Sequence, residues 1–112
     1  MSDGNGPRMT LPTQLVLRVL LTRPAGEMYG LEVCAEAGLP SGTVHPILAR
    51  LEGLEWVVSR WEDTDPAAAG RPRRRYYSLT EDGAERARIA LAEATTATAA
   101  LRLRARPAGG IA

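Results

Sequence analysis

The chain has 112 residues with 14 basic and 13 acidic side chains, every basic one being Arg, so its net charge of +1 favours no particular partner. A hydrophobic fraction of 45% supports one packed domain, and the absence of an apolar run of 18 residues excludes a membrane-spanning helix. The lone Cys34 excludes an internal disulfide framework and fits a reducing cytoplasm. In chain order, residues 1–9 come first and are expected to form a disordered, mostly polar arm.

Two short helices are predicted next. Residues Thr10–Thr22 carry apolar side chains at three- and four-residue steps, and Thr10 can cap their first turn. Residues Glu27–Ala37 form a second segment, which Gly38 ends because glycine readily adopts the left-handed conformation found after helices. One face of this second helix carries Leu31, Cys34 and Ala35. We therefore expect Cys34 to be a small buried hydrophobe and not a reactive thiol.

The stretch Leu39–Leu54 is predicted to contain the central helix, which follows a turn at Pro40 and whose first turn can be capped by the Ser41 hydroxyl. Because Pro46 removes one backbone hydrogen bond, we expect a slight kink or a helix start shifted by a residue. The apolar face consists of Val44, Ile47, Leu48, Leu51 and Leu54. The N-terminal tip is slim and polar and consists of Ser41, Gly42, Thr43 and His45. A DNA major groove admits such a tip, but the pattern alone favours an ordinary amphipathic surface helix.

A β-hairpin is predicted after the central helix. Residues Trp56–Glu62 and Arg73–Leu79 have the β-branched and aromatic content of strands. Residues Asp63–Pro72 between them are rich in Pro, Gly and Asp, which indicates a loop that protrudes as a tip. Alternation along the second strand should turn Tyr77 and Leu79 toward the core.

The last predicted helix begins at Thr80 and runs to about Arg104. Acidic residues follow Thr80 and suit the positive end of a helix, whereas Gly83 spoils a full capping box. An alternating three- and four-residue spacing, as in a coiled-coil seam, relates Ala84, Ala87, Leu91, Ala94, Thr98 and Leu101. These mostly small side chains would let a partner helix approach closely. We predict a dimerisation helix at residues 80–106 and a tail at 107–112.

The order of these elements is typical of a mainly α fold with a small β-hairpin. It predicts a winged helix-turn-helix domain at residues 10–79, followed by the long C-terminal dimerisation helix. The motifs that support a family resemblance are Tyr29–Glu32, Gly38–Leu48, Arg50–Glu52, Trp61–Glu62 and Gly70–Thr80. On these motifs the chain resembles the PadR family of bacterial transcription regulators. The resemblance covers about residues 11–90 and extends to the family's compact members, which carry a single dimerisation helix.

The resemblance implies a homodimeric repressor that binds a near-palindromic operator in double-stranded DNA. The residues expected to contact DNA from the recognition helix are Ser41, Gly42, Thr43, His45 and Arg50. The family usually has Tyr immediately before the proline that corresponds to Pro46, and this chain has His45. Histidine reaches less far than tyrosine, and its charge depends on pH. His45 is therefore expected to contact a base or the DNA backbone, the alternative being a plain solvent-facing residue.

Four arginines fall within the five positions Arg71–Arg75. Guanidinium groups match phosphate oxygens and can enter a narrow minor groove. The resemblance therefore implies a DNA-binding wing, with expected contacts at Arg71, Pro72, Arg73 and Arg74. We expect Arg71 and Arg73 to be the two arginines that reach DNA. The alternative for Arg74 and Arg75 is an ion pair with Glu62 or Asp63 across the hairpin.

The sequence contains no recognisable set of catalytic residues, no phosphate-binding glycine loop and no His, Cys or carboxylate spacing typical of metal ligands. We therefore expect that the protein is not an enzyme and that it has no cofactor and no metal site. Family members also sense small planar compounds near the dimer interface. Trp56 and Trp61 are the candidates for stacking such an aromatic effector, unless they are core residues. The rival function is a winged-helix protein–protein interaction module whose arginines bind an acidic partner without sequence-specific DNA binding. As a regulator, the protein is expected in the bacterial cytoplasm, at the nucleoid.

Overall fold

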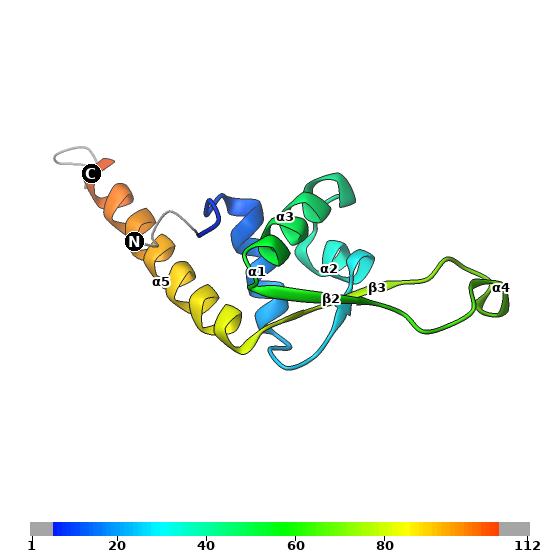
Figure 1. Ribbon diagram of the computed structural model, residues 1–112. Helices are drawn as coiled ribbons and strands as arrows, with labels where there is room; N and C mark the ends of the chain where they lie inside the picture. The colour runs from blue at the N-terminus through cyan, green and yellow to red at the C-terminus, as the bar shows by residue number, and fades with distance from the viewer. Residues whose placement is uncertain (1–5, 106–112) are drawn as a thin grey trace.

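The computed structural model describes residues 6–105, so most of the expected arm and the whole expected tail lie outside the described residues. Figure 1 shows a helical body from which a hairpin and a long helix project. The elements are α1 (Leu11–Leu21), β1 (Met28–Tyr29), α2 (Gly30–Ala37), α3 (Ser41–Gly53), β2 (Val57–Trp61), α4 (Pro66–Ala69), β3 (Arg75–Leu79) and α5 (Glu81–Ala105). The predicted mainly α fold with a winged helix-turn-helix and a long C-terminal helix is confirmed.

The sheet has three antiparallel strands in the order β1-β3-β2, one more than the predicted hairpin. Met28 and Tyr29, assigned to a helix from the sequence, instead pair with Tyr77 and Tyr76 of β3. The backbone of Tyr29 is extended and caps α2, so that helix begins at Gly30 and not at Glu27. The hairpin of β2, β3 and the residues between them is called the wing below. Through its pairing with β3, the extra strand connects the start of α2 to the base of the wing.

The core lies where α1, α2, α3 and α5 meet the sheet. Its largest fully buried side chains include Leu17, Met28, Leu48 and Leu51. Tyr77 and Leu79 are buried in it as predicted, and so is Cys34. Leu31 does not share the buried face of Cys34 as expected, because 65% of its surface is exposed.

Helix α3 begins one residue earlier than a Ser41 cap would place it. Pro40 holds the N-cap position, and no side chain caps the helix. Pro46 lies in the second turn, where the helix accommodates it without ending. At the other end, Trp56 N–H donates to Leu51 O at 3.0 Å across Glu55, whose φ is a left-handed +64°. This closing turn sends the chain directly into β2.

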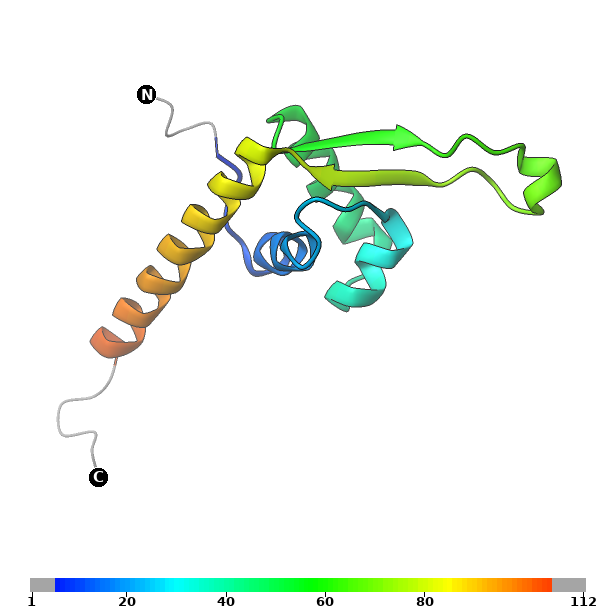
Figure 2. The same cartoon turned by 90° about the horizontal axis from the view of Figure 1, so that it is seen from below.

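Helix α5 begins as predicted, with the Thr80 hydroxyl accepting from Gly83 N–H at 2.8 Å. Gly83 itself lies on the backbone of Trp56, where an added Cβ would come within 2.0 Å of the carbonyl oxygen. The glycine therefore permits a close crossing and is more than a defect in the cap. From this crossing α5 leads away from the body on the side opposite the wing (Figure 2).

Candidate nucleic-acid interface

The N-terminal tip of α3 is presented to solvent. Ser41, Gly42 and His45 are exposed and Thr43 is half-buried, while Val44 and Leu48 hold the opposite face in the core. The first N–H groups of a helix have no partner within it and point outward with the positive end of its dipole. The predicted polar tip is therefore available for anionic groups and hydrogen-bond acceptors.

His45 folds back over the start of α2. Its Nδ1 lies 3.1 Å from Ser41 O, and a carbonyl can only accept, so Nδ1 donates. In the neutral ring Nε2 is then an acceptor. A Cβ on Gly30 would lie 2.7 Å from this Nε2, so glycine at position 30 makes room for the imidazole.

The wing arginines divide into different environments. The guanidinium of Arg71 forms a two-pronged ion pair with Glu62, with NH1–Oε1 at 2.7 Å and NH2–Oε2 at 2.9 Å. The alternative raised for Arg74 and Arg75 is therefore wrong in its partners, because Glu62 takes the side chain of Arg71 and not that of Arg74 or Arg75. Arg73 is exposed and its Nε donates to Thr64 O at 3.0 Å. Of the two arginines expected to reach DNA, Arg73 keeps its charge without a carboxylate partner among the described residues.

Arg74 and Arg75 are held at the base of the wing. The guanidinium of Arg74 lies 4.1 Å from the ring centroid of Tyr29. Arg75 donates to Ser59 Oγ at 2.9 Å and lies 3.4 Å from a carboxylate oxygen of Glu52. Because Glu52 belongs to α3, this contact fixes the wing relative to that helix. Tyr29, Ser59 and Glu52 were not predicted to take part, and sequence spacing gave no signal of contacts between separate elements.

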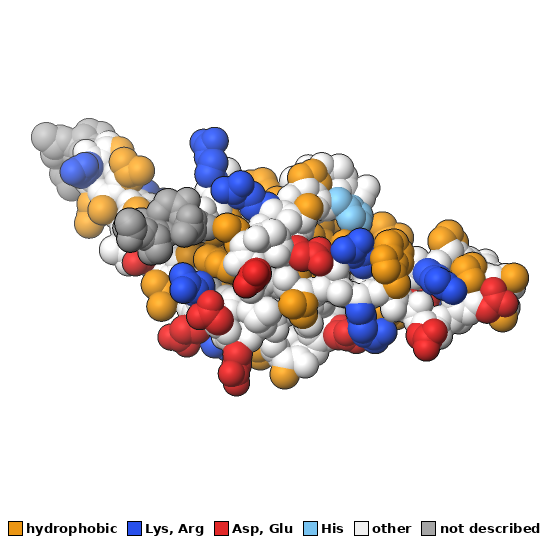
Figure 3. Space-filling model, in the orientation of Figure 1, with side chains coloured by type: hydrophobic (Ala, Val, Ile, Leu, Met, Phe, Trp, Pro, Cys, Tyr) orange, Lys and Arg blue, Asp and Glu red, His pale blue; other side chains and the backbone are white. Residues whose placement is uncertain are grey.

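A cleft of about 590 Å³ lies between α3 and the wing and is lined by residues of both. It brings together five predicted contact residues: His45, Arg71, Pro72, Arg73 and Arg74. It does not include Ser41, Gly42, Thr43 or Arg50. Arg50 instead lines a separate groove of about 320 Å³ with Pro46 and Ile47. Figure 3 shows the chain's single histidine on the same face as arginines at the base of the wing.

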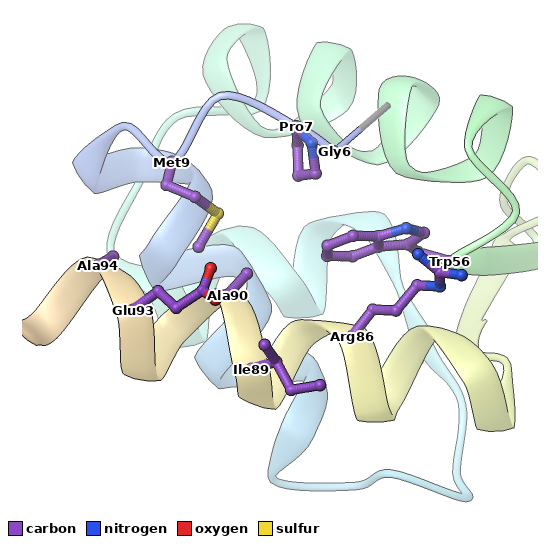
Figure 4. A pocket seen from close by; sticks show the side chains of 9 residues that line it. All are labelled: Gly6, Pro7, Met9, Trp56, Arg86, Ile89, Ala90, Glu93 and Ala94. Atoms are coloured by element: carbon purple, nitrogen blue, oxygen red, sulfur yellow. The ribbon is translucent and has the colours of Figure 1, made fainter. Parts of the chain in front are cut away.

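The two tryptophans have different surroundings. Trp61 is 57% exposed, lines the cleft, and has Arg75 at 5.2 Å from its ring, so it is not a core residue. Trp56 is buried in the core, yet its ring borders a hollow of about 540 Å³ beside α5. Met9, Ile89 and Ala94 also line this hollow (Figure 4).

Half of the expected dimerisation seam lies inside the chain's own core. Ala84, Ala87 and Leu91 are all at most 9% exposed and pack in the core cluster. Since α5 uses this stretch to attach to the body, we correct the prediction for these three residues. Ala94 is half-buried, and Thr98 and Leu101 are exposed, so the outer half of the seam remains accessible.

Between residues 6 and 105, no group of three His, Cys, Asp or Glu side chains could hold a metal ion. The same stretch contains no helix that is long and apolar enough to span a bilayer.

The family model described as "Transcriptional regulator PadR-like family" matches residues 16–89, which is more than half of the chain. A PadR family transcription regulator from Clostridium difficile R20291 is 22% identical with a TM-score of 0.64, over 84% of this chain and 97% of that one. Disulfide-formed AbfR is 26% identical with a TM-score of 0.60, over 79% of this chain and 54% of that one. Reduced AbfR bound to DNA is 25% identical with a TM-score of 0.60, over 80% and 58%. The chain thus spans little more than half of AbfR, and no curated protein matches it.

Proposed function

The chain belongs to the PadR-like family of transcriptional regulators, and from this premise we propose that it represses transcription as a homodimer bound to operator DNA. One observation carries the proposal: His45 of α3 and Arg73 of the wing line the same cleft. A duplex seated over that cleft would meet the exposed tip of α3 and the wing together. AbfR, which shares the fold, has been solved bound to DNA.

The two elements would contribute different parts of the binding energy. The tip of α3, from Ser41 to His45, would enter the major groove and supply base contacts and phosphate positioning. Arg73 would contact phosphate or the minor groove and supply affinity that does not depend on sequence. The guanidinium of Arg71 is paired with Glu62, so Arg73 is proposed as the main phosphate contact of the wing.

Dimerisation is proposed through the outer part of α5. Exposed apolar side chains there include Leu101 and Leu103, at 64% and 67% exposure, next to Thr98. Two copies joined along this helix would place their α3 helices in successive major grooves, about 34 Å apart. The operator would then be near-palindromic, and the protein would act in the bacterial cytoplasm. A small aromatic effector would have the hollow beside Trp56 as its site.

Selection of bound duplexes from random DNA tests the proposal, because it returns half-site, spacing and symmetry together. The selected duplex is then titrated with the wild type and with Arg73→Ala across a series of salt concentrations. Loss of one phosphate contact should lower the salt slope by about 0.9. Arg18→Ala is the matched control, because it removes an exposed arginine of α1 outside the cleft.

The protein–protein alternative makes a different prediction. A module that recognises an acidic protein would select no DNA motif and would not be displaced from its partner by unrelated duplex. Failure to enrich any sequence, with a correctly folded protein, would refute the DNA-binding proposal and leave this alternative.

A further inference from the structure

Glu62 lies at the base of the wing. It makes more hydrogen bonds to the segment Arg71–Arg75 than the two of a forked ion pair. Its carboxylate accepts both prongs of the Arg71 guanidinium, at 2.7 and 2.9 Å. The same Oε1 accepts the backbone N–H of Arg74 at 3.2 Å, and Glu62 N–H donates to Arg74 O at 2.7 Å. Residues 71 and 74 are therefore both fastened to one side chain.

This arrangement fixes where the intervening residues go. Positions 71 and 74 are held to Glu62, and the two residues between them, Pro72 and Arg73, are exposed. The same contacts close the loop that contains α4. The Glu62 side chain is only 14% exposed and that of Arg71 34%, so the carboxylate is largely shielded from water. A forked, partly buried Arg–carboxylate pair is the geometry in which such a pair is strongest.

We propose that Glu62 is a positioning residue for nucleic-acid binding: together with Arg71 it forms a clasp, residues 62, 71 and 74, that sets the wing so that Arg73 reaches DNA. The Arg71 guanidinium then stabilises the wing through Glu62 and does not contact a phosphate. The inference rests on the proposed function. Electrostatic repulsion alone predicts the opposite effect. Because Glu62 is an anion and DNA is a polyanion, removal of the Glu62 charge would then tighten DNA binding.

The test compares Glu62→Gln with Asp63→Asn, which removes the same charge one residue away. Asp63 is exposed and makes no hydrogen bond or ion pair among residues 6–105. Binding to the selected duplex is measured by fluorescence anisotropy at fixed salt. We expect Glu62→Gln to weaken binding roughly fivefold or more, equivalent to about 1 kcal/mol. Asp63→Asn should leave binding unchanged or tighten it, because only long-range repulsion is lost.

Arg71→Lys separates the clasp from a phosphate contact. Lysine keeps the charge but lacks the planar fork that grips both carboxylate oxygens. The clasp predicts that Arg71→Lys weakens binding about as much as Glu62→Gln, and that the double variant is no weaker than either single one. A direct phosphate contact predicts that Arg71→Lys binds nearly as well as the wild type.

A measurement without DNA completes the design. Hydrogen exchange of residues 62–75 in the free protein should be faster in Glu62→Gln than in the wild type, and unchanged in Asp63→Asn. Tighter binding of Glu62→Gln, or unchanged exchange in it, would overturn the inference. A wild type that binds no duplex would instead overturn the proposed function, so the two failures are distinguishable.

Discussion

Replacement of Gly83 by alanine should destabilise the protein, although alanine is the better helix former. A Cβ at this position would lie 2.0 Å from Trp56 O and 2.6 Å from the carbonyl carbon. The helix cannot simply move outward, because Thr80 N–H and its hydroxyl contact the same oxygen at 2.9 and 3.3 Å. Overpacking costs about 1–3 kcal/mol, and each lost hydrogen bond about 1 kcal/mol. These costs exceed the gain of about 1 kcal/mol from removing a helical glycine.

We therefore expect Gly83→Ala to lower the free energy of unfolding by about 2 kcal/mol, which corresponds to a fall in Tm of about 10 °C for a domain of this size. Circular dichroism during thermal and urea unfolding, at a fixed chain concentration, measures both quantities. Gly53→Ala is the control, because an added Cβ there meets nothing within 4 Å. It should be neutral or stabilising by up to about 1 kcal/mol. Equal stability of the two variants would refute the close crossing of α5 over Trp56.

Three further outcomes are expected. Leu101→Asp should shift the sedimentation coefficient from dimer to monomer without changing the helical content, whereas a persisting dimer would contradict the outer α5 interface. The Cys34 thiol, which is buried, should react with a thiol reagent only at the rate of unfolding, so fast labelling of the native protein would refute its burial. The Arg71 guanidinium lowers the pKa of the Glu62 carboxyl from 4.5 to about 2, with the Arg74 N–H adding to the effect. The stability that the pair contributes is thus present above pH 4.5 and lost as pH falls through about 2; a carboxyl NMR titration should show a higher pKa for Glu62 in Arg71→Ala.

The fold was predictable because local signals and tertiary structure agree along most of the chain. Thr10 and Thr80 cap helices as expected, and Gly38 ends α2 in the left-handed conformation. Alternation also placed Tyr77 and Leu79 in the core correctly. The extended pair Met28 and Tyr29 was missed, because two residues are too short for a strand pattern and only pairing with β3 holds them extended.

The site was only partly predictable, because the pattern gives the residues but not their partners. The polar tip of α3 is exposed as expected, and the arginines do lie on the wing. Which arginine pairs with Glu62 depends on how the chain between Asp63 and Gly70 folds, and its short helix α4 was not anticipated. The seam on α5 failed at Ala84, Ala87 and Leu91 because periodicity identifies a buried face without saying what buries it.

The backbone of Trp56 contacts both the end of α3 and the start of α5. Its N–H closes the last turn of α3 through Leu51 O, and its carbonyl receives the start of α5 at Thr80. The two peptide groups that flank Trp56 therefore connect α3 to α5, and Gly83 allows α5 to approach the backbone of Trp56 closely. In a pair of chains joined along α5, the angle at which the two α5 helices cross would dictate the distance between the two α3 helices. The spacing of the operator half-sites would then depend on α5, a helix that is not proposed to contact DNA.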